Sequence, residues 1–168
     1  MLALLVAAAL MPASPACHAS GVRSVVANLD GDRAKEHVQA RDAHNCSHTH
    51  FAASVVIFDR CRGAWTEVPV AEEQSRLRYF QVLDVDRWTR RREVFFFIGD
   101  KVRIVRLAAR RGECPQPVDL FSATGVSSVD LADLTPRYRG LELQVTANGE
   151  TTFHRYARTQ RRYVPYTA

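Results

Sequence analysis

The sequence predicts an all-β domain built from three similar units, each of four short antiparallel strands. The first observation is a repeat, because Pro69, Pro117 and Pro165 stand at intervals of 48 residues, each beside a valine and after a turn-like stretch. The second is an acidic signature before each proline, which ends in a glutamate: Glu36, Glu93 and Glu142. The third is a series of β-branched and aromatic runs separated by turn residues, which is typical of short strands. A repeat at this interval indicates one supersecondary unit used three times.

Each unit contains four predicted strands. In the first unit they span roughly 22–28, 36–41, 51–58 and 64–70. In the second they span roughly 76–83, 93–98, 101–107 and 113–118. In the third they span roughly 126–132, 141–146, 151–156 and 162–166. Gly99-Asp100 and Asn148-Gly149 predict tight hairpin turns, and a helical turn is expected around Ala71–Ser75.

The chain of 168 residues is long enough for one domain with a sizeable core. Residues 1–20 carry no charge and contain the short apolar run Leu2–Leu10, which predicts a secretory signal peptide cleaved near Ala16 or Ala19. Cys17 offers a lipoprotein signal as a weaker alternative. We therefore expect an extracytoplasmic protein, secreted or at the cell surface. Residues 21–168 form its single domain, with repeats at about 22–70, 76–118 and 126–166.

The charge of the chain argues against a nucleic-acid surface. The formal net charge is +5, and the basic residues are 21 Arg and 2 Lys. These arginines are scattered along the chain, whereas a nucleic-acid interface concentrates them on one face. We expect no nucleic-acid partner and no membrane span. A net positive charge favours weak attraction to an anionic polymer such as that of a cell wall.

The stretch 27–37, ANLDGDRAKEH, has the pattern of a calcium loop or of a polar turn. Asn28, Asp30, Asp32 and Glu36 alternate along it, and Ala34 adds a backbone carbonyl. Ca²⁺ prefers several hard oxygen ligands of this kind, converging from a tight loop. The alternative is a polar turn in which the same side chains bond the loop's own backbone.

This pattern resembles the FG-GAP and VCBS-type repeats of integrin-like β-propellers and secreted bacterial proteins. The resemblance implies four-stranded blades with Ca²⁺ held between the first two strands of a blade. Where those repeats have Asp and Gly, this chain has Asn28 and Arg33. Three blades are fewer than a closed propeller uses, so the resemblance implies a partial propeller, with a β-sandwich as the alternative fold.

The equivalent loops of the other two units carry fewer acids. The second keeps Asp84, Asp86 and Glu93, but its interior is filled by Trp88 and by the arginine run 90–92. The third keeps Asp133 and Glu142. We expect these acids to bond backbone N–H groups or arginines rather than a metal ion.

The first unit has an insertion, residues 40–49, that contains alternating metal-binding side chains. His44, Cys46, His48 and His50 carry the imidazole and thiolate groups that bind Zn²⁺ or copper. On a flat strand, alternate residues stand about 7 Å apart, which is too far for one ion. An exposed polar loop is therefore the main expectation, and a transition-metal site is the alternative.

The cysteines predict one disulfide. Removal of Cys17 leaves Cys46, Cys61 and Cys114. Cys61 and Cys114 stand at equivalent turns of adjacent units, whereas a predicted strand separates Cys46 from Cys61. We therefore favour Cys61–Cys114 over Cys46–Cys61.

No nucleophile elbow, phosphate-binding glycine loop or dinucleotide fingerprint occurs in the sequence. The recurring carboxylates stand at equivalent places, as parts of a repeated structural loop would. The sequence therefore predicts a non-catalytic binding or structural module whose partner is a protein or an anionic wall polymer. A homodimer is one way in which an open array could cover its edges.

Overall fold

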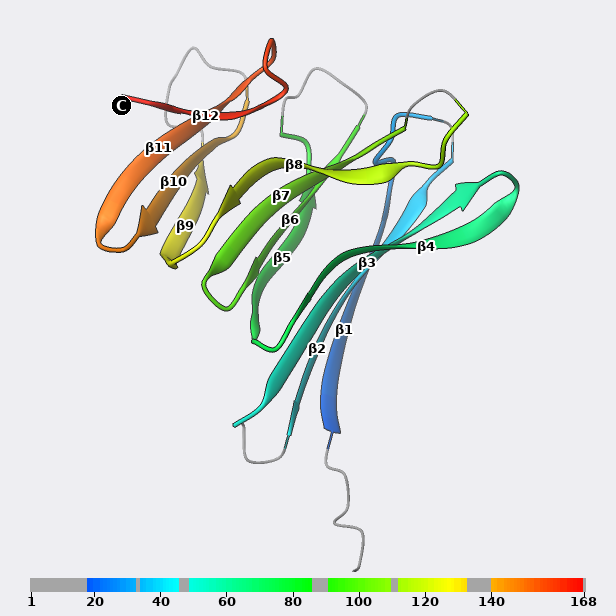
Figure 1. Cartoon of the computed structure of the whole chain (residues 1–168), viewed down its shortest axis with the longest axis horizontal. Coiled ribbons are helices and arrows are strands. Elements are labelled where there is room, and N and C mark those ends of the chain that lie inside the picture. Colours follow the sequence, from blue (N-terminus) through cyan, green and yellow to red (C-terminus); the bar gives the residue numbers. More distant parts are fainter. Residues whose placement is uncertain are drawn as a thin grey trace, which may run out of the picture.

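The computed structural model of the chain describes residues 18–32, 34–45, 49–85, 91–109, 112–132 and 140–167. These residues form twelve strands in three four-stranded antiparallel sheets, which lie side by side in chain order (Figure 1). The all-β prediction and the three four-stranded units are confirmed. In the described part of the chain, no helix is long and apolar enough to cross a membrane.

Each sheet is a simple meander of consecutive strands. Sheet 1 contains β1 (His18–Ala27), β2 (Glu36–Asn45), β3 (Phe51–Cys61) and β4 (Ala64–Glu73). Sheet 2 contains β5 (Leu77–Leu83), β6 (Glu93–Ile98), β7 (Lys101–Ala108) and β8 (Gln116–Ala123). Sheet 3 contains β9 (Val126–Ala132), β10 (Glu142–Ala147), β11 (Glu150–Ala157) and β12 (Arg162–Tyr166).

Three local expectations differ from the structure. The helical turn at Ala71–Ser75 is wrong, because Ala71 and Glu72 pair with Val55 and Ser54 of β3. The insertion 40–49 is not wholly a loop, since residues 40–45 continue β2, and residues 40–44 pair with both neighbouring strands. The fourth strand of the second unit starts later than expected, at Gln116.

The predicted hairpin turns follow from the backbone conformations of their residues. Asn148 and Gly149 both have positive φ, 51° and 83°, as a type I′ turn between β10 and β11 requires. Arg62 and Gly63 repeat this arrangement between β3 and β4, with φ of 52° and 84°. These turns hold successive strands in direct antiparallel register.

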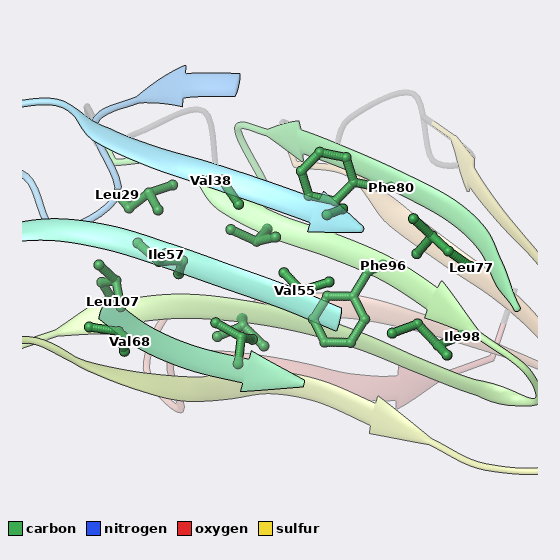
Figure 2. Close-up of a cluster of buried hydrophobic side chains, with 14 of the residues drawn as sticks. Leu29, Val38, Val55, Ile57, Val68, Leu77, Phe80, Phe96, Ile98 and Leu107 are labelled. Carbon is green, nitrogen blue, oxygen red and sulfur yellow. The ribbon is translucent and has the colours of Figure 1, made fainter. Parts of the chain in front are cut away.

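Sheet 2 is the middle layer, and it is covered on both faces. All six residues of its strand β6 are buried. One core lies between sheets 1 and 2, where Val55 and Ile57 meet Phe96 and Ile98 (Figure 2). A second core lies between sheets 2 and 3, with Phe95 and Phe97 on one side and Leu143 and Val145 on the other. Alternating side chains of one strand thus supply both cores.

In the end sheets, β2 and β10 carry polar residues on their outer faces at the positions where β6 carries apolar ones. In β6, the residues that follow Glu93 by one, three and five positions pack toward sheet 1: Val94, Phe96 and Ile98. The same positions after Glu36 face away from the core and are polar: His37, Gln39 and Arg41. On the other face, Phe95 and Phe97 correspond to Gln144 and Thr146 in sheet 3. Terminal repeats of stacked arrays need such polar outer positions to stay soluble.

We therefore expect the three-sheet domain to be stable without a second copy. Sedimentation velocity over a range of micromolar concentrations should give a single monomeric species. The reason is that the outer faces of β2 and β10 expose polar side chains, which water can solvate without a second copy. A concentration-independent dimer would favour the homodimer expected from the sequence.

A disulfide ties sheet 1 to sheet 2. The predicted pairing of Cys61 with Cys114 is present, with 5.5 Å between the Cα atoms. Cys61 ends β3, and Cys114 precedes β8. Beside the disulfide, the Arg62 guanidinium donates a hydrogen bond of 3.0 Å to the carbonyl of Gly112. The other candidate for this bond, Cys46, lies outside the described residues.

Replacing both cysteines of this disulfide with serine should lower the free energy of unfolding by about 2–4 kcal/mol. The bond spans a sequence separation of 53 residues, so its loss frees a long loop in the unfolded chain. Urea unfolding of residues 21–168 measures the change, and the reduced wild type is the matched control. Equal stability of the oxidised and reduced wild type would contradict the expectation.

Candidate functional site

The loop between β1 and β2 wraps around a buried carboxylate. Glu36, the first residue of β2, is 0% exposed. Its Oε2 accepts a hydrogen bond from the backbone N–H of Leu29, whose own side chain is buried in the core between sheets 1 and 2 (Figure 2). The apolar anchor and this bond together fix the loop over the end of sheet 1.

The loop also bonds to itself through its polar side chains. The N–H of Gly31 donates to Asn28 Oδ1 at 2.7 Å, and the N–H of Asp32 donates to Asp30 Oδ1 at 2.9 Å. The N–H of Ala34 donates to Asp32 Oδ1 at 2.6 Å. The Asn28 amide additionally donates to the carbonyl of Asp32. These are the bonds of the self-bonding polar turn, and they use the Oδ1 atoms of both aspartates.

The same loop gathers three carboxylates. Asp30, Asp32 and Glu36 each offer an oxygen, and these oxygens lie within 4.8 Å of one another. Glu36 Oε1 is fully buried and accepts no hydrogen bond from the described part of the chain. A buried oxygen of an ionised carboxylate is costly unless a donor or a cation satisfies it. The cluster therefore has the geometry and the unmet bonding capacity of a cation site.

The electrostatics of the cluster point the same way. The pKa of Glu36 is raised to about 7, mainly by burial and also by the carboxylates of Asp30, Asp59 and Asp32, while the bond from Leu29 opposes the rise. Burial and the nearby Asp30 likewise raise the pKa of Asp59. Several negative charges in one partly desolvated place disfavour the ionised forms. Without a cation, the cluster therefore holds protons that an isolated carboxyl group would have lost.

The donor set favours a hard cation. Carboxylate and amide oxygens suit Ca²⁺, which accepts irregular coordination by oxygens and water. Among the predicted ligands, Asp30, Asp32 and Glu36 are brought together, whereas the amide of Asn28 is used within the loop. Ala34 is part of the same turn, because its N–H donates a hydrogen bond to Asp32 Oδ1. Arg33 lies outside the described residues.

An arginine of the second unit lies against this loop from the solvent side. A Cβ atom added to Gly31, whose φ is +88°, would stand 2.4 Å from Arg91 Nε. Glycine is therefore required at this position for two reasons, the backbone conformation and the close approach of Arg91. The backbone N–H of Arg92 also donates to the carbonyl of Asn28 at 2.8 Å. The loop is thus part of the contact between the first two units.

Asp59 lies beside this cluster of three carboxylates and was not predicted from the sequence. It lies near the end of β3 and is 2% exposed. The pairing of His37 with Phe58 places it beside Glu36 on the neighbouring strand. A signal existed, because Arg106 and Arg155 each follow their glutamate by 13 residues and occupy the equivalent position. Asp59 follows Glu36 by 23 residues, so the insertion in the first unit hid the correspondence.

The second unit satisfies its glutamate internally. Oε2 of the buried Glu93 accepts a bond of 2.9 Å from the N–H of Val85, as Glu36 does from Leu29. Its Oε1 accepts from Arg106 Nε at 2.8 Å and forms an ion pair with the same guanidinium. This is the arrangement expected for the second loop. Asp84 is described, whereas Asp86 and Trp88 lie outside the described residues, as does Asp133 of the third loop.

The histidine-rich insertion is described only in part. His44 lies opposite Phe51, with 6.0 Å between ring centroids, and His50 Nδ1 lies 3.0 Å from Thr49 Oγ1. Cys46 and His48 fall outside the described residues. Within the described ranges, the grouping of three or more metal-binding side chains is the acidic cluster of the first loop. The transition-metal alternative stays a prediction.

Comparisons with protein-family models, with curated proteins and with solved structures found no match to this chain. The resemblance to FG-GAP and VCBS-type repeats therefore stays a prediction, and the functional argument rests on the site itself. Neither the comparisons nor the described residues give a positive indication of catalysis.

The raised pKa of Glu36 predicts a pH dependence of stability in chelator. A carboxyl group whose pKa is higher in the folded state than its usual 4.5 stabilises the fold when protonated, so this contribution is lost as pH rises through about 7. The melting temperature of the ion-free protein should therefore fall between pH 5 and pH 8. Glu36→Gln should flatten the decline, because the amide does not titrate. An identical decline in this variant would contradict the assignment.

Proposed function

We propose that this chain is an exported, non-catalytic binding or structural module, and that one Ca²⁺ in the loop 28–36 braces its first blade. The observation that carries the proposal is the buried Glu36, whose Oε1 accepts no bond from the described residues and which stands beside Asp30 and Asp32. A divalent cation would satisfy this oxygen and neutralise the neighbouring acids. It would act on the stability of the loop and has no part in chemistry.

Bracing this loop would stiffen more than the loop itself. The segment carries the buried Leu29 at one end and leads into β2 at the other. Its Asn28 carbonyl accepts the bond from Arg92 of the second unit. An ion held between the loop and Glu36 would therefore also support the contact between sheets 1 and 2. This is a structural role of the kind that Ca²⁺ has in many extracellular modules.

Export is supported by two independent features. The uncharged, apolar segment at residues 1–20 has the character of a signal peptide. The Cys61–Cys114 disulfide suits an oxidising compartment outside the cytoplasm. The formal charge of +5 favours an anionic polymer of that compartment as a partner, with a protein as the other possibility.

The outer face of sheet 1 offers a contact surface for such a partner. A groove of about 430 Å³ lies there and is lined by His37, Gln39, Phe58 and Trp65. Trp65 is 57% exposed and meets the His37 ring edge-to-face, with 5.4 Å between the centroids. Exposed aromatic rings with polar neighbours are common at binding surfaces. This face supports a binding role in addition to a structural one.

Saturating Ca²⁺ should raise the melting temperature of the mature domain. A ligand that binds only the folded state adds about 2.7 kcal/mol at a hundredfold excess over its dissociation constant, which corresponds to about 5–10 °C for a domain of this size. The same measurement on Asp30→Ala and Glu36→Gln should show little or no shift, because each change removes a negatively charged ligand.

Glu142→Gln is the matched control for these variants. It alters the equivalent buried glutamate of the third unit, so it reports the general cost of losing such a group. We expect it to lower the melting temperature in chelator while keeping the shift caused by Ca²⁺. Equal melting curves of the wild type with Ca²⁺ and with chelator would refute calcium binding.

A further inference from the structure

Each unit has a buried glutamate at the equivalent position, and the charge of the residue opposite that glutamate differs between units. In the third unit, Glu142 of β10 pairs across the sheet with Arg155 of β11. In the first unit, His37 pairs with Phe58, so the next residues along the two strands, Glu36 and Asp59, also lie opposite each other. In the second unit, Val94 pairs with Val105, so Glu93 and Arg106 lie opposite each other in the same way. Two units therefore have an arginine at this position, and the first unit has a carboxylate.

The second unit shows what the arginine does. Arg106, 9% exposed, gives Nε to Glu93 Oε1 at 2.8 Å. Its third nitrogen, Nη1, donates to the Tyr156 hydroxyl of sheet 3 at 3.0 Å. One buried carboxylate is thus neutralised by one buried guanidinium. Both oxygens of Glu93 accept hydrogen bonds, and the guanidinium donates to Glu93 and to Tyr156. A buried charge is tolerated under these conditions.

The first unit has twice the negative charge at the same place. Asp59, 2% exposed, and Glu36, 0% exposed, are both buried, and Asp30 and Asp32 lie close by. Glu36 Oε1 accepts no hydrogen bond within the described part of the chain, although the equivalent oxygen of Glu93 is satisfied by Arg106. Two buried carboxylates call for two positive charges, which a single divalent cation supplies.

We propose that in the first unit a divalent cation takes the place that the Arg106 guanidinium occupies in the second, and that it balances the negative charge of the neighbouring Asp59. The residue at this position of the third strand then determines whether a blade holds a metal ion or neutralises its glutamate internally. This inference rests on the proposed Ca²⁺ site and extends it to a residue outside the loop. Ca²⁺ fits because all the groups that converge are oxygen donors.

Two variants of Asp59 test the role of this residue. Isothermal titration of the mature domain with CaCl₂ should show at least tenfold weaker binding for Asp59→Asn, which removes the charge and keeps the shape. Asp59→Arg should abolish binding, because its guanidinium pairs with Glu36. In chelator, Asp59→Arg should melt at or above the temperature of the wild type, because it supplies the missing positive charge.

Glu67→Arg is the control for the change in net charge. Glu67 is exposed on β4 and pairs with Phe58 on the opposite face of the same sheet. It should bind Ca²⁺ as the wild type does. If Asp59→Arg does not fold, Asp59→Asn alone decides, since unchanged affinity in that variant overturns the inference and a tenfold loss supports it.

The outcomes separate this inference from the proposed function. A wild type that does not bind Ca²⁺ removes the proposed function, and with it the cation that would balance Asp59. A wild type that binds Ca²⁺, together with Asp59 variants that bind it equally well, overturns the inference and leaves the loop site intact.

Discussion

The burial of the middle sheet on both faces is the constraint on which the rest of the fold depends. Its strand β6, from Glu93 to Ile98, has no exposed residue. Such a strand cannot stand at a water-facing surface, because every second side chain would lose its apolar cover. Sheets 1 and 3 provide that cover, and each needs only one apolar face to do so (Figure 1). The alternating polar and apolar pattern of the end sheets and the uniformly apolar β6 are therefore parts of one arrangement.

The buried glutamates of the first two units accept the same backbone hydrogen bond but face residues of opposite charge. Leu29 and Val85 each donate their N–H to the glutamate that starts the following strand. That bond satisfies one carboxylate oxygen and leaves the other to be matched. In the second unit, burial lowers the pKa of Arg106, but Glu93 and Tyr156 together more than offset this, so the guanidinium stays charged. The first unit keeps the backbone hydrogen bond to its glutamate but has Asp59 in place of the arginine.

Much of the fold could be predicted because its signals are local. Strand alternation, the Asn148-Gly149 turn and the equivalence of Cys61 and Cys114 can be read within single units or by comparing units. The helical turn at Ala71–Ser75 failed because residues with helical preference pair with β3, and tertiary pairing overrides propensity. Pro117 fits inside β8 because that strand is at the edge of its sheet, where a missing N–H donor is tolerated.

The candidate site was predicted only where its residues are close in sequence. Asp30, Asp32 and Glu36 alternate within one loop, so their convergence follows from spacing. Asp59 joins them through the register between β2 and β3, and those two strands are lengthened by the insertion in the first unit. The polar residues of that insertion suggested a loop, but Arg41 lies on the outer face of an end sheet and Asp42 accepts a hydrogen bond from the N–H of Leu77, so both are compatible with a strand.

The single disulfide of the described residues makes the two contacts between sheets unequal. Sheets 1 and 2 are joined covalently through Cys61 and Cys114, whereas sheets 2 and 3 are joined by side-chain packing and by bonds such as that from Arg106 to Tyr156. A pulling force or a transient opening that detaches sheet 3 would therefore leave the first two sheets linked. The acidic loop lies within this linked pair. The domain thus combines a disulfide-linked pair of sheets, which contains the candidate ion site, with a third sheet that non-covalent contacts hold against it.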